Sequence, residues 1–448
     1  MKYELKTDPL NDPILKGMIR FAIPVSVSFL MTMLFSFADT VVIGRFGHEN
    51  AISAIGVSAS VLNFLVSGIT ALSTGVLVTA GRYYGEQKID EVRQLLHHIP
   101  AIALLPGTAL AAVSILTSNL LLQLLNCPAL IFQDALLYLR IYCLGIPLVT
   151  LTSFFAAILE AKGNSFLPFL FQIAASIVNV CLNLLFVIVF DWNVAGVAAA
   201  TVISELVPVI LLGAWFLRQN DELKLDLRHL RGPHGTKPVF EIGMPSSLEG
   251  IILNLSGVII ASFINRFDTA VIAGNTIGTQ LEGLMVVTFT GFAGASTVFI
   301  SQNFGAGNHL RVKQIFRTTM ITVFLAAELS GILLYLCAPV LAGIFTTDVQ
   351  IISCAVSRMF YMCLFFGLCG TMNVVSGCIR GLGDAKSPLY ISIFGSVIFR
   401  LTWVFTYGVA KNTPEAVYMS FPICWFLCTA LNILAFQRLA KTKLTIGL

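Results

Sequence analysis

Long apolar runs recur along this chain of 448 residues, and they limit what it can fold into. A run of about 20 apolar residues is long enough to cross the hydrocarbon core of a bilayer as one helix. Twelve such runs are predicted, at residues 18–43, 52–80, 95–118, 130–158, 166–190, 194–217, 239–264, 270–299, 314–341, 350–378, 388–409 and 415–437. Only 11% of the residues are charged, which leaves too little polar surface to cover a water-soluble fold. The sequence therefore predicts an all-α polytopic membrane protein with twelve transmembrane helices.

The positions of the basic residues predict how these spans are oriented. Because the number of spans is even, both termini lie on one side of the membrane. Of the 27 Lys and Arg residues, only Arg45, Arg266 and Lys411 fall in loops on the opposite side, and three more fall inside spans. Loops rich in Lys and Arg stay in the cytoplasm. We therefore expect both termini in the cytoplasm and the protein in the cytoplasmic (inner) membrane.

The longest polar interruption stands at the centre of the chain and divides the spans into six and six. A shift of 220 residues aligns GNSFLP, which begins at Gly163, with GDAKSP, which begins at Gly383, and a shift of 221 pairs Pro24 with Pro245. This repetition predicts two copies of one six-helix unit. The predicted organisation is an N-terminal lobe at 1–217, a cytoplasmic linker at 218–237 and a C-terminal lobe at 238–448. Parallel repeats of this kind are typical of transporters.

Short motifs in both halves resemble those of a known family. They are IPVSVSFLMTMLFSFADTVVIGRFG, AISAIG, GRYYGEQ, EAKGNSFLP, NVCLNLLFV and VAGVAAAT, then GMPSSLEG, VIAGNTIG, SQNFGAGN and GCIRGLGDAKSP. In their order, spacing and duplication, the chain resembles the multidrug and toxic compound extrusion (MATE) family over essentially its whole length. The resemblance implies two pseudo-symmetric six-helix bundles, the MATE fold. It also implies a secondary antiporter that exports organic, often cationic, molecules in exchange for Na+ or H+.

Asp39 lies inside the first apolar span, within the stretch SFADTVVIGRFG. A carboxylate at the bilayer centre costs roughly 2.5–3.5 kcal/mol on insertion scales, so such residues usually face a cavity and serve a function. The resemblance implies that Asp39 matches the first-helix acid of the family branch that keeps its ion site in the N-terminal lobe. At the other positions of that site this sequence has Tyr138, Asn179, Asn183 and Thr201. Asn179 and Asn183 are four residues apart, so both project from one helix face.

One position of this site departs from the family pattern, because Asn183 stands where many relatives have a second aspartate. An amide keeps an oxygen ligand but removes a negative charge. Na+ is a hard cation that accepts carboxylate, amide and hydroxyl oxygens, so Asp39, Asn179 and Asn183 are the expected metal ligands if the ion is Na+. H+ and Na+ both stay open, and no other cofactor is expected because no nucleotide-binding motif is present. Either ion is expected to neutralise Asp39, alter the packing of the first helix and favour release of the exported compound.

Four residues of the second half are predicted to bind substrate: Glu249, Asn254, Glu282 and Met285. An acid in a cavity lined by Met and Phe suits lipophilic cations, since it combines one charge contact with adaptable packing. Met285 equally fits simple helix packing, and Glu249 lies only four residues after Pro245, near the predicted cytoplasmic end. Arg400 is a candidate partner for Glu282 or for an exported anion.

Two other classes of membrane protein compete with this interpretation. A flippase for lipid-linked oligosaccharides, from the same superfamily, would be expected to have a more basic central cavity, and the arginines inside spans are Arg140, Arg358 and Arg400. A membrane enzyme would need a catalytic motif, and neither HExxH nor GxSxG occurs, so no enzymatic activity is expected. The expected partners are small organic molecules and the lipid bilayer. We expect a monomer and no nucleic-acid partner.

Overall fold

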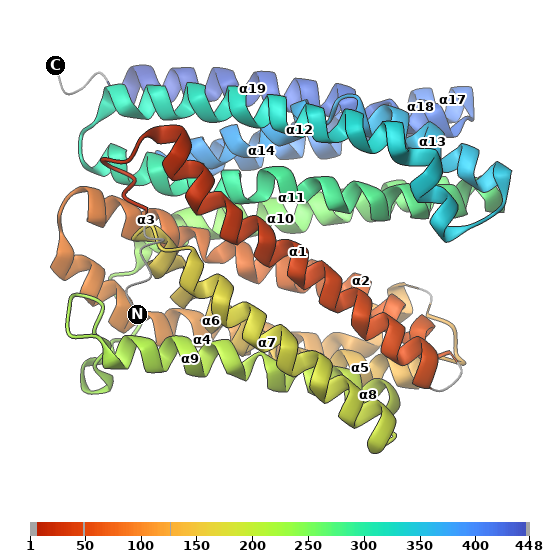
Figure 1. Ribbon diagram of the computed structural model, residues 1–448, viewed down its shortest axis with the longest axis horizontal. Coiled ribbons are helices and arrows are strands. Elements are labelled where there is room, and N and C mark those ends of the chain that lie inside the picture. The colour runs from red at the N-terminus through yellow and green to blue at the C-terminus, as the bar shows by residue number, and fades with distance from the viewer. Residues whose placement is uncertain (1–6, 48–49, 126, 445–448) are drawn as a thin grey trace. The chain divides into compact units, whose positions relative to one another are not determined.

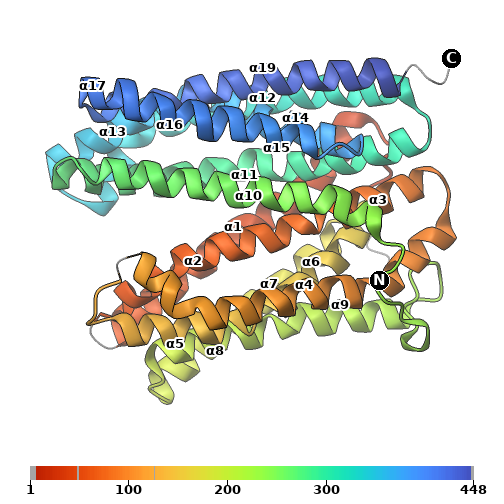
Figure 2. The same ribbon diagram turned by 180° about the vertical axis from the view of Figure 1, so that it is seen from behind.

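The computed structural model describes residues 7–47, 50–125 and 127–444, and every regular element among them is helical (Figures 1 and 2). Eleven helices of this part of the chain are long and apolar enough to cross a membrane. A further pair of helices, bent by 46° at its junction, makes a twelfth span. The all-α class and the expected number of spans are therefore confirmed, and the chain is a multi-pass membrane protein.

Contacts along the chain divide it into two compact units. Among the described residues, unit 1 comprises Val27–Ser247, and unit 2 comprises Thr7–Ser26 together with the chain from Leu248 onward. Two helices, α1 (Ile14–Phe46) and α10 (Lys237–Ile264), are each divided between the units. The lobe boundaries at 1–217, 218–237 and 238–448 stay a prediction. Their outer ends, 1–6 and 445–448, lie outside the described residues.

Unit 1 contains the second part of α1, the first turns of α10 and eight helices between them. These are α2 (Ala51–Leu72), α3 (Thr74–Gly85), α4 (Ile89–Leu124), α5 (Phe132–Cys143), α6 (Ile146–Ala161), α7 (Phe166–Leu184), α8 (Asn193–Ser204) and α9 (Leu206–Arg218). Within the unit α4 packs along α6, α5 along α8, and α7 against both α8 and α9. The packing of α7 on α8 brings together the two helices that carry most of the predicted ion site.

Unit 2 contains the rest of α10 and the helices that follow it. These are α11 (Thr269–Gly305), α12 (His309–Phe345), α13 (Val349–Cys363), α14 (Phe366–Gly381), α15 (Lys386–Ser392), α16 (Arg400–Trp403), α17 (Val409–Lys411), α18 (Pro414–Tyr418) and α19 (Ser420–Lys443). The long helix α11 packs against α12, α13 and α14, and α14 packs against α19. The pair α13 and α14 is the bent span.

The first described residues of the chain pack on helices that come much later in the sequence. The amide nitrogen of Asn303 donates to the carbonyl of Pro9 at 2.9 Å, across a separation of 294 residues. The hydroxyl of Thr319 donates to the sulfur of Met18 at 2.9 Å, across 301 residues. The start of α1 therefore completes unit 2, although its second part belongs to unit 1.

Corresponding turns of the two units share their backbone conformation. Gly163 has φ of 91° and Gly383 has φ of 78°, in the left-handed region that favours glycine. In a second pair of turns, 220 residues apart, Gln87 has φ of 57° and Gly307 has φ of 72°. Short π-helical segments also recur, at Leu185–Val189 and at Val404–Gly408. The repeat seen in the sequence is thus also a repeat of local structure.

Two histidines hold the predicted linker against the start of α4. The Nε2 atom of His97 accepts the backbone N–H of Asp226 at 3.1 Å. The Nδ1 atom of His98 lies 2.5 Å from the carbonyl oxygen of Gly232. The backbone N–H of Arg228 bonds the carboxylate of Asp226 and, as the largest cause, holds the pKa of that group below its usual value. The linker is therefore an ordered part of unit 1.

Candidate functional site

Polar residues at helical spacing on three helices of unit 1 converge on one cavity of about 110 Å³. They are Thr32, Ser36 and Asp39 on α1, Gln172, Ser176 and Asn179 on α7, and Thr201 and Ser204 on α8, with Glu205 directly after them. Residues three or four positions apart lie on the same face of a helix. Each of these apolar spans therefore presents a polar stripe to the cavity.

Hydrogen bonds join four of the five residues predicted for the ion site. The amide nitrogen of Asn183 donates to Asp39 Oδ1 at 2.5 Å and to Asn179 Oδ1 at 3.2 Å. The amide nitrogen of Asn179 donates to the hydroxyl of Thr201 at 3.3 Å. These contacts link α1, α7 and α8 within unit 1. The role of the four residues in ion coupling stays a prediction.

One acceptor of this cluster has no donor. The side chain of Asn183 is fully buried, and its Oδ1 has no hydrogen-bond partner among the described residues. Leaving a buried acceptor unpaired costs about 1–3 kcal/mol, so this arrangement suits a position at which a further donor or a cation is bound. Asp39, which is half-buried, supplies the negative charge beside it. Carboxylate, amide and hydroxyl oxygens together suit a hard cation, and the carboxylate alone can take a proton.

Tyr138, the fifth predicted residue, is buried on α5, and its ring centroid lies 6.2 Å from that of Tyr142. Tyr142, one turn further along, lines the cavity together with Asp39. The sequence analysis missed both Tyr142 and Gln172. Their spacing was the available signal, because Tyr142 follows Tyr138 by four residues and Gln172 precedes Asn179 by seven, which is two helical turns.

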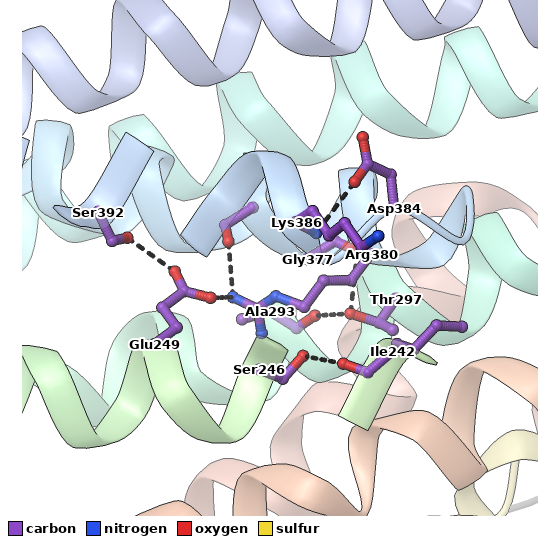
Figure 3. A network of polar contacts seen from close by, with 11 residues as sticks. Ile242, Ser246, Glu249, Ala293, Thr297, Gly377, Arg380, Asp384, Lys386 and Ser392 are labelled. Carbon is purple, nitrogen blue, oxygen red and sulfur yellow. Dashed lines mark hydrogen bonds and ion pairs between the residues drawn. The ribbon is translucent and has the colours of Figure 1, made fainter. Parts of the chain in front are cut away.

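Glu249 of unit 2 lies within a polar network that Figure 3 shows from close by. Its side chain is buried, and its Oε1 accepts the hydroxyl of Ser392 at 2.8 Å. Its Oε2 lies 3.6 Å from Nη2 of Arg380, and the same nitrogen donates to the hydroxyl of Ser376 at 2.6 Å. Both carboxylate oxygens of Glu249 therefore have partners, and a cationic ligand would have to compete with Arg380.

Glu282 on α11 pairs with Arg358 of α13, and the candidate pairing with Arg400 is corrected accordingly. The Nη2 atom of Arg358 lies 2.5 Å from Glu282 Oε2, and its Nη1 donates to Asn275 Oδ1 at 3.0 Å. Gly278 lies one turn before Glu282 on α11, and a Cβ there would lie 2.7 Å from Cδ of Arg358. The missing side chain at this glycine makes room for the arginine, which decides the pairing.

Arg400 is buried against an aromatic ring instead of an acid. Its guanidinium carbon lies 4.5 Å from the ring centroid of Phe421, and its Nη2 lies 3.2 Å from the sulfur of Cys424. The guanidinium of Arg358 lies 5.7 Å from the same ring. Because the face of an aromatic ring attracts cations, Phe421 serves both arginines.

The two other predicted substrate residues have simpler surroundings. Asn254 is exposed on α10, and its amide nitrogen donates to the carbonyl of Gly250 at 2.9 Å. Met285 is buried on α11. Glu249 and Glu282 belong to two different clusters of unit 2. The substrate role of all four residues stays a prediction.

The repeated turns, the apolar spans and the polar cluster inside one unit define a multi-pass membrane protein built on a duplicated helical scaffold, an architecture of transporters. The profile of the MatE family matches residues 24–185 and again residues 245–405. The chain belongs to the MatE family. Its two matched segments are the two halves that align in the sequence.

Known proteins resemble the chain over most of its length. It is 26% identical to "probable multidrug resistance protein NorM" of Thermotoga maritima over 399 residues, 88% of this chain and 85% of that protein. It is 21% identical to "multidrug export protein MepA" of Staphylococcus saprophyticus over 389 residues, 86% of this chain and 85% of that protein. A solved structure, the outward-facing conformation of a multidrug resistance MATE family transporter of the MOP superfamily, matches with a TM-score of 0.89 at 19% identity. That match covers 98% of this chain and 99% of the other. The predicted MATE family and fold are confirmed.

Proposed function

We propose that this protein is a cation-coupled antiporter that exports organic cations across the cytoplasmic membrane by alternating access. H+ or Na+ enters in exchange, and the protein works as a monomer with both termini in the cytoplasm. The observation that carries the proposal is the buried, unpartnered Oδ1 of Asn183 next to the carboxylate of Asp39. The names of the relatives, multidrug resistance and multidrug export proteins, support the class of substrate.

The proposed coupling step acts on the contact between α1 and α7. Asp39 accepts a hydrogen bond from Asn183, and this bond ties the two helices together. A proton or Na+ at Asp39 withdraws negative charge from the acceptor and weakens the bond, because hydrogen bonds to charged groups are the stronger ones. The ion drives transport only as far as it binds one conformation of the protein more tightly than the other.

The proposed substrate residues are Glu249, Asn254, Glu282 and Met285. In the described structure the two acids among them face Arg380 and Arg358. A cation that displaces either arginine must replace an ion pair, so charge alone gives it little advantage. Apolar contact has to supply the rest of the affinity, which favours bulky lipophilic cations over small hydrophilic ones.

The test is transport of ethidium in proteoliposomes that contain the full-length protein, with Na+ and H+ gradients imposed separately. Asp39→Asn keeps an oxygen but removes the charge. We expect it to lower gradient-driven transport roughly 100-fold, the upper range of a coupling free energy between two sites. Glu328→Gln is the matched control. It makes the same change in α12 of unit 2, where Glu328 Oε2 accepts the backbone N–H of Gly367 at 2.8 Å and an amide oxygen can do the same.

The two gradients separate the ions. Transport that follows only the Na+ gradient assigns Na+ to the Asp39 cluster, and transport that follows only the H+ gradient assigns the proton. An Asp39→Asn protein that transports ethidium as fast as wild type, with the same response to the gradient, overturns the proposed role of Asp39.

A second candidate function is a flippase for lipid-linked oligosaccharides, whose pyrophosphate-type linkage is anionic. The observation that favours it is Arg400, which is buried in unit 2 and takes part in no ion pair among the described residues. Ethidium accumulation in cells that express the protein separates the two functions. Lower dye accumulation supports export, whereas a change in cell-envelope polymer with unchanged dye supports flipping.

A further inference from the structure

A groove of about 310 Å³ lies between the first turns of α12 and the last turns of α19 in unit 2. Its lining comprises two lysines, two phenylalanines and two other residues, namely Lys313, Lys441, Phe316, Phe436, Gln437 and Ala440. The rings of Phe316 and Phe436 stack with centroids 3.8 Å apart and planes 5° apart. They form an apolar floor that ends at two ammonium groups.

The groove lies where a lipid headgroup meets its acyl chains. Both helices are candidate membrane spans, α12 beginning at His309 and α19 ending at Lys443, and their two ends lie side by side in both views (Figures 1 and 2). Lys313 and Lys441 therefore stand at the interface, and the two rings lie about one turn deeper in each helix. Such a sequence of charge and then aromatic surface matches the order of groups in a phospholipid.

The charge around the groove has one sign. The relevant ends of α12 and α19 carry six basic residues, Arg311, Lys313, Arg317, Arg438, Lys441 and Lys443, and no Asp or Glu. Two of the six bind the protein itself, since Arg311 donates to the carbonyls of Pro9 and Asp12 and Lys443 donates to that of Leu382 at 2.9 Å. Lys313 is exposed and points its charge at the groove it lines.

We propose that this groove binds one anionic phospholipid, with its phosphate between Lys313 and Lys441 and the upper part of an acyl chain on the rings of Phe316 and Phe436. A soluble phosphate would gain nothing from the apolar floor. A lipid without net charge would gain from the floor but less from the two ammonium groups. An anionic phospholipid is the ligand class that uses both features.

The experiment measures retained lipid by native mass spectrometry. Full-length protein is purified from nanodiscs that contain equal amounts of phosphatidylglycerol and phosphatidylcholine. We expect one phosphatidylglycerol to be retained per protein in preference to phosphatidylcholine. The double variant Lys313→Gln with Lys441→Gln should lower this retention roughly twentyfold, from about fivefold per lysine at a membrane surface.

Two controls separate the groove from general surface charge and the lipid from its headgroup. Lys237→Gln with Lys411→Gln removes the same charge away from the groove and should leave retention unchanged. Phe316→Ala tests the apolar floor and should lower retention severalfold. Water-soluble glycerophosphoglycerol, added in excess, should not displace the lipid.

Each alternative result overturns the proposal. Equal retention of the two lipids by wild type removes the charge argument, and unchanged retention in the groove double variant removes the site. Displacement by glycerophosphoglycerol assigns the site to a phosphate group alone. Thermal unfolding of every variant, followed by tryptophan fluorescence, identifies any variant whose loss of lipid comes from loss of fold.

Discussion

Unit 1 and unit 2 place different chemistry at corresponding points of one scaffold. In unit 1 these points carry acceptors and one carboxylate, and in unit 2 they carry apolar or aromatic residues and a cation. Counted 220 or 221 residues onward, Asp39, Tyr138, Asn179, Asn183 and Thr201 become Ile260, Arg358, Phe399, Trp403 and Phe421. The hydrogen-bonded oxygen cluster of unit 1 therefore corresponds to an aromatic and arginine cluster in unit 2. The difference teaches that the scaffold does not dictate the sign of charge it holds.

The buried ion pair of unit 2 gives the largest expected effect. Glu282→Gln leaves the guanidinium of Arg358 without its carboxylate, and removing one partner of a buried pair costs about 3–5 kcal/mol. Thermal unfolding in detergent, followed by tryptophan fluorescence, measures the loss. Glu328→Gln is the control for changing an intramembrane acid, and equal stability of the two variants would show that the pair with Arg358 contributes nothing.

The amide of unit 1 gives the next effect. Asn183→Leu removes the donor to Asp39 and Asn179, and we expect a loss of about 2–3 kcal/mol because one of the two bonds goes to a carboxylate. Asn183→Asp sharpens the comparison, since it places a third acceptor among acceptors that only a cation or proton can join. Its unfolding temperature should rise with Na+ or with acid more steeply than that of wild type. An Asn183→Asp protein that is indifferent to both would contradict an ion site here.

The room that Gly278 leaves for Arg358 gives a smaller effect. Gly278→Ala puts a Cβ within 2.7 Å of the arginine side chain, and overpacking of this kind costs about 1–3 kcal/mol. Gly257→Ala on α10 is the matched control, because no heavy atom lies within 4 Å of a Cβ built there. Unfolding measurements should show Gly278→Ala less stable and Gly257→Ala unchanged or more stable. Equal behaviour of the two alanines would remove the steric explanation for the pairing of Glu282.

The smallest expected effect lies in the turns that the two units share. Gln87 adopts φ of 57° where Gly307 adopts 72°. Gln87→Gly relieves a left-handed strain of about 1–2 kcal/mol but adds freedom to the unfolded chain, so we expect a net gain below about 1 kcal/mol. Gly307→Gln should lose stability. Unfolding temperatures that move in the same direction in both variants would show that the two turns are not equivalent.

The spans and part of the candidate site could be predicted because their signals are local. A transmembrane helix needs only a run of apolar residues, so the spans were recognisable from the chain itself. Asn179 and Asn183 share a helix face by their spacing alone, and the resemblance supplied Asp39 and Thr201, which the structure brings into hydrogen-bond contact with them. Their joint position needed no knowledge of the other unit.

The partners of the intramembrane charges could not be predicted in the same way. Arg358 and Arg400 both lie in apolar spans, and nothing near either residue in the sequence indicates which one faces Glu282. The choice depends on how α11 packs against α13 and on the space left at Gly278. The ion pair of Glu249 with Arg380 is a similar case, because its members come from helices far apart in the chain. Tertiary packing decides such pairs, whereas hydropathy only locates the helices that carry them.

The placement of Thr7–Ser26 in unit 2 has a consequence for how the protein is made. These residues leave the ribosome first, but the groups that contact Pro9 and Met18 are about 300 residues behind them. At a synthesis rate of roughly 5–20 residues per second, the start of α1 waits roughly 15–60 s before its partners exist. Assembly of unit 2 therefore closes a loop that spans most of the chain, a step of high contact order that follows membrane insertion of the first spans.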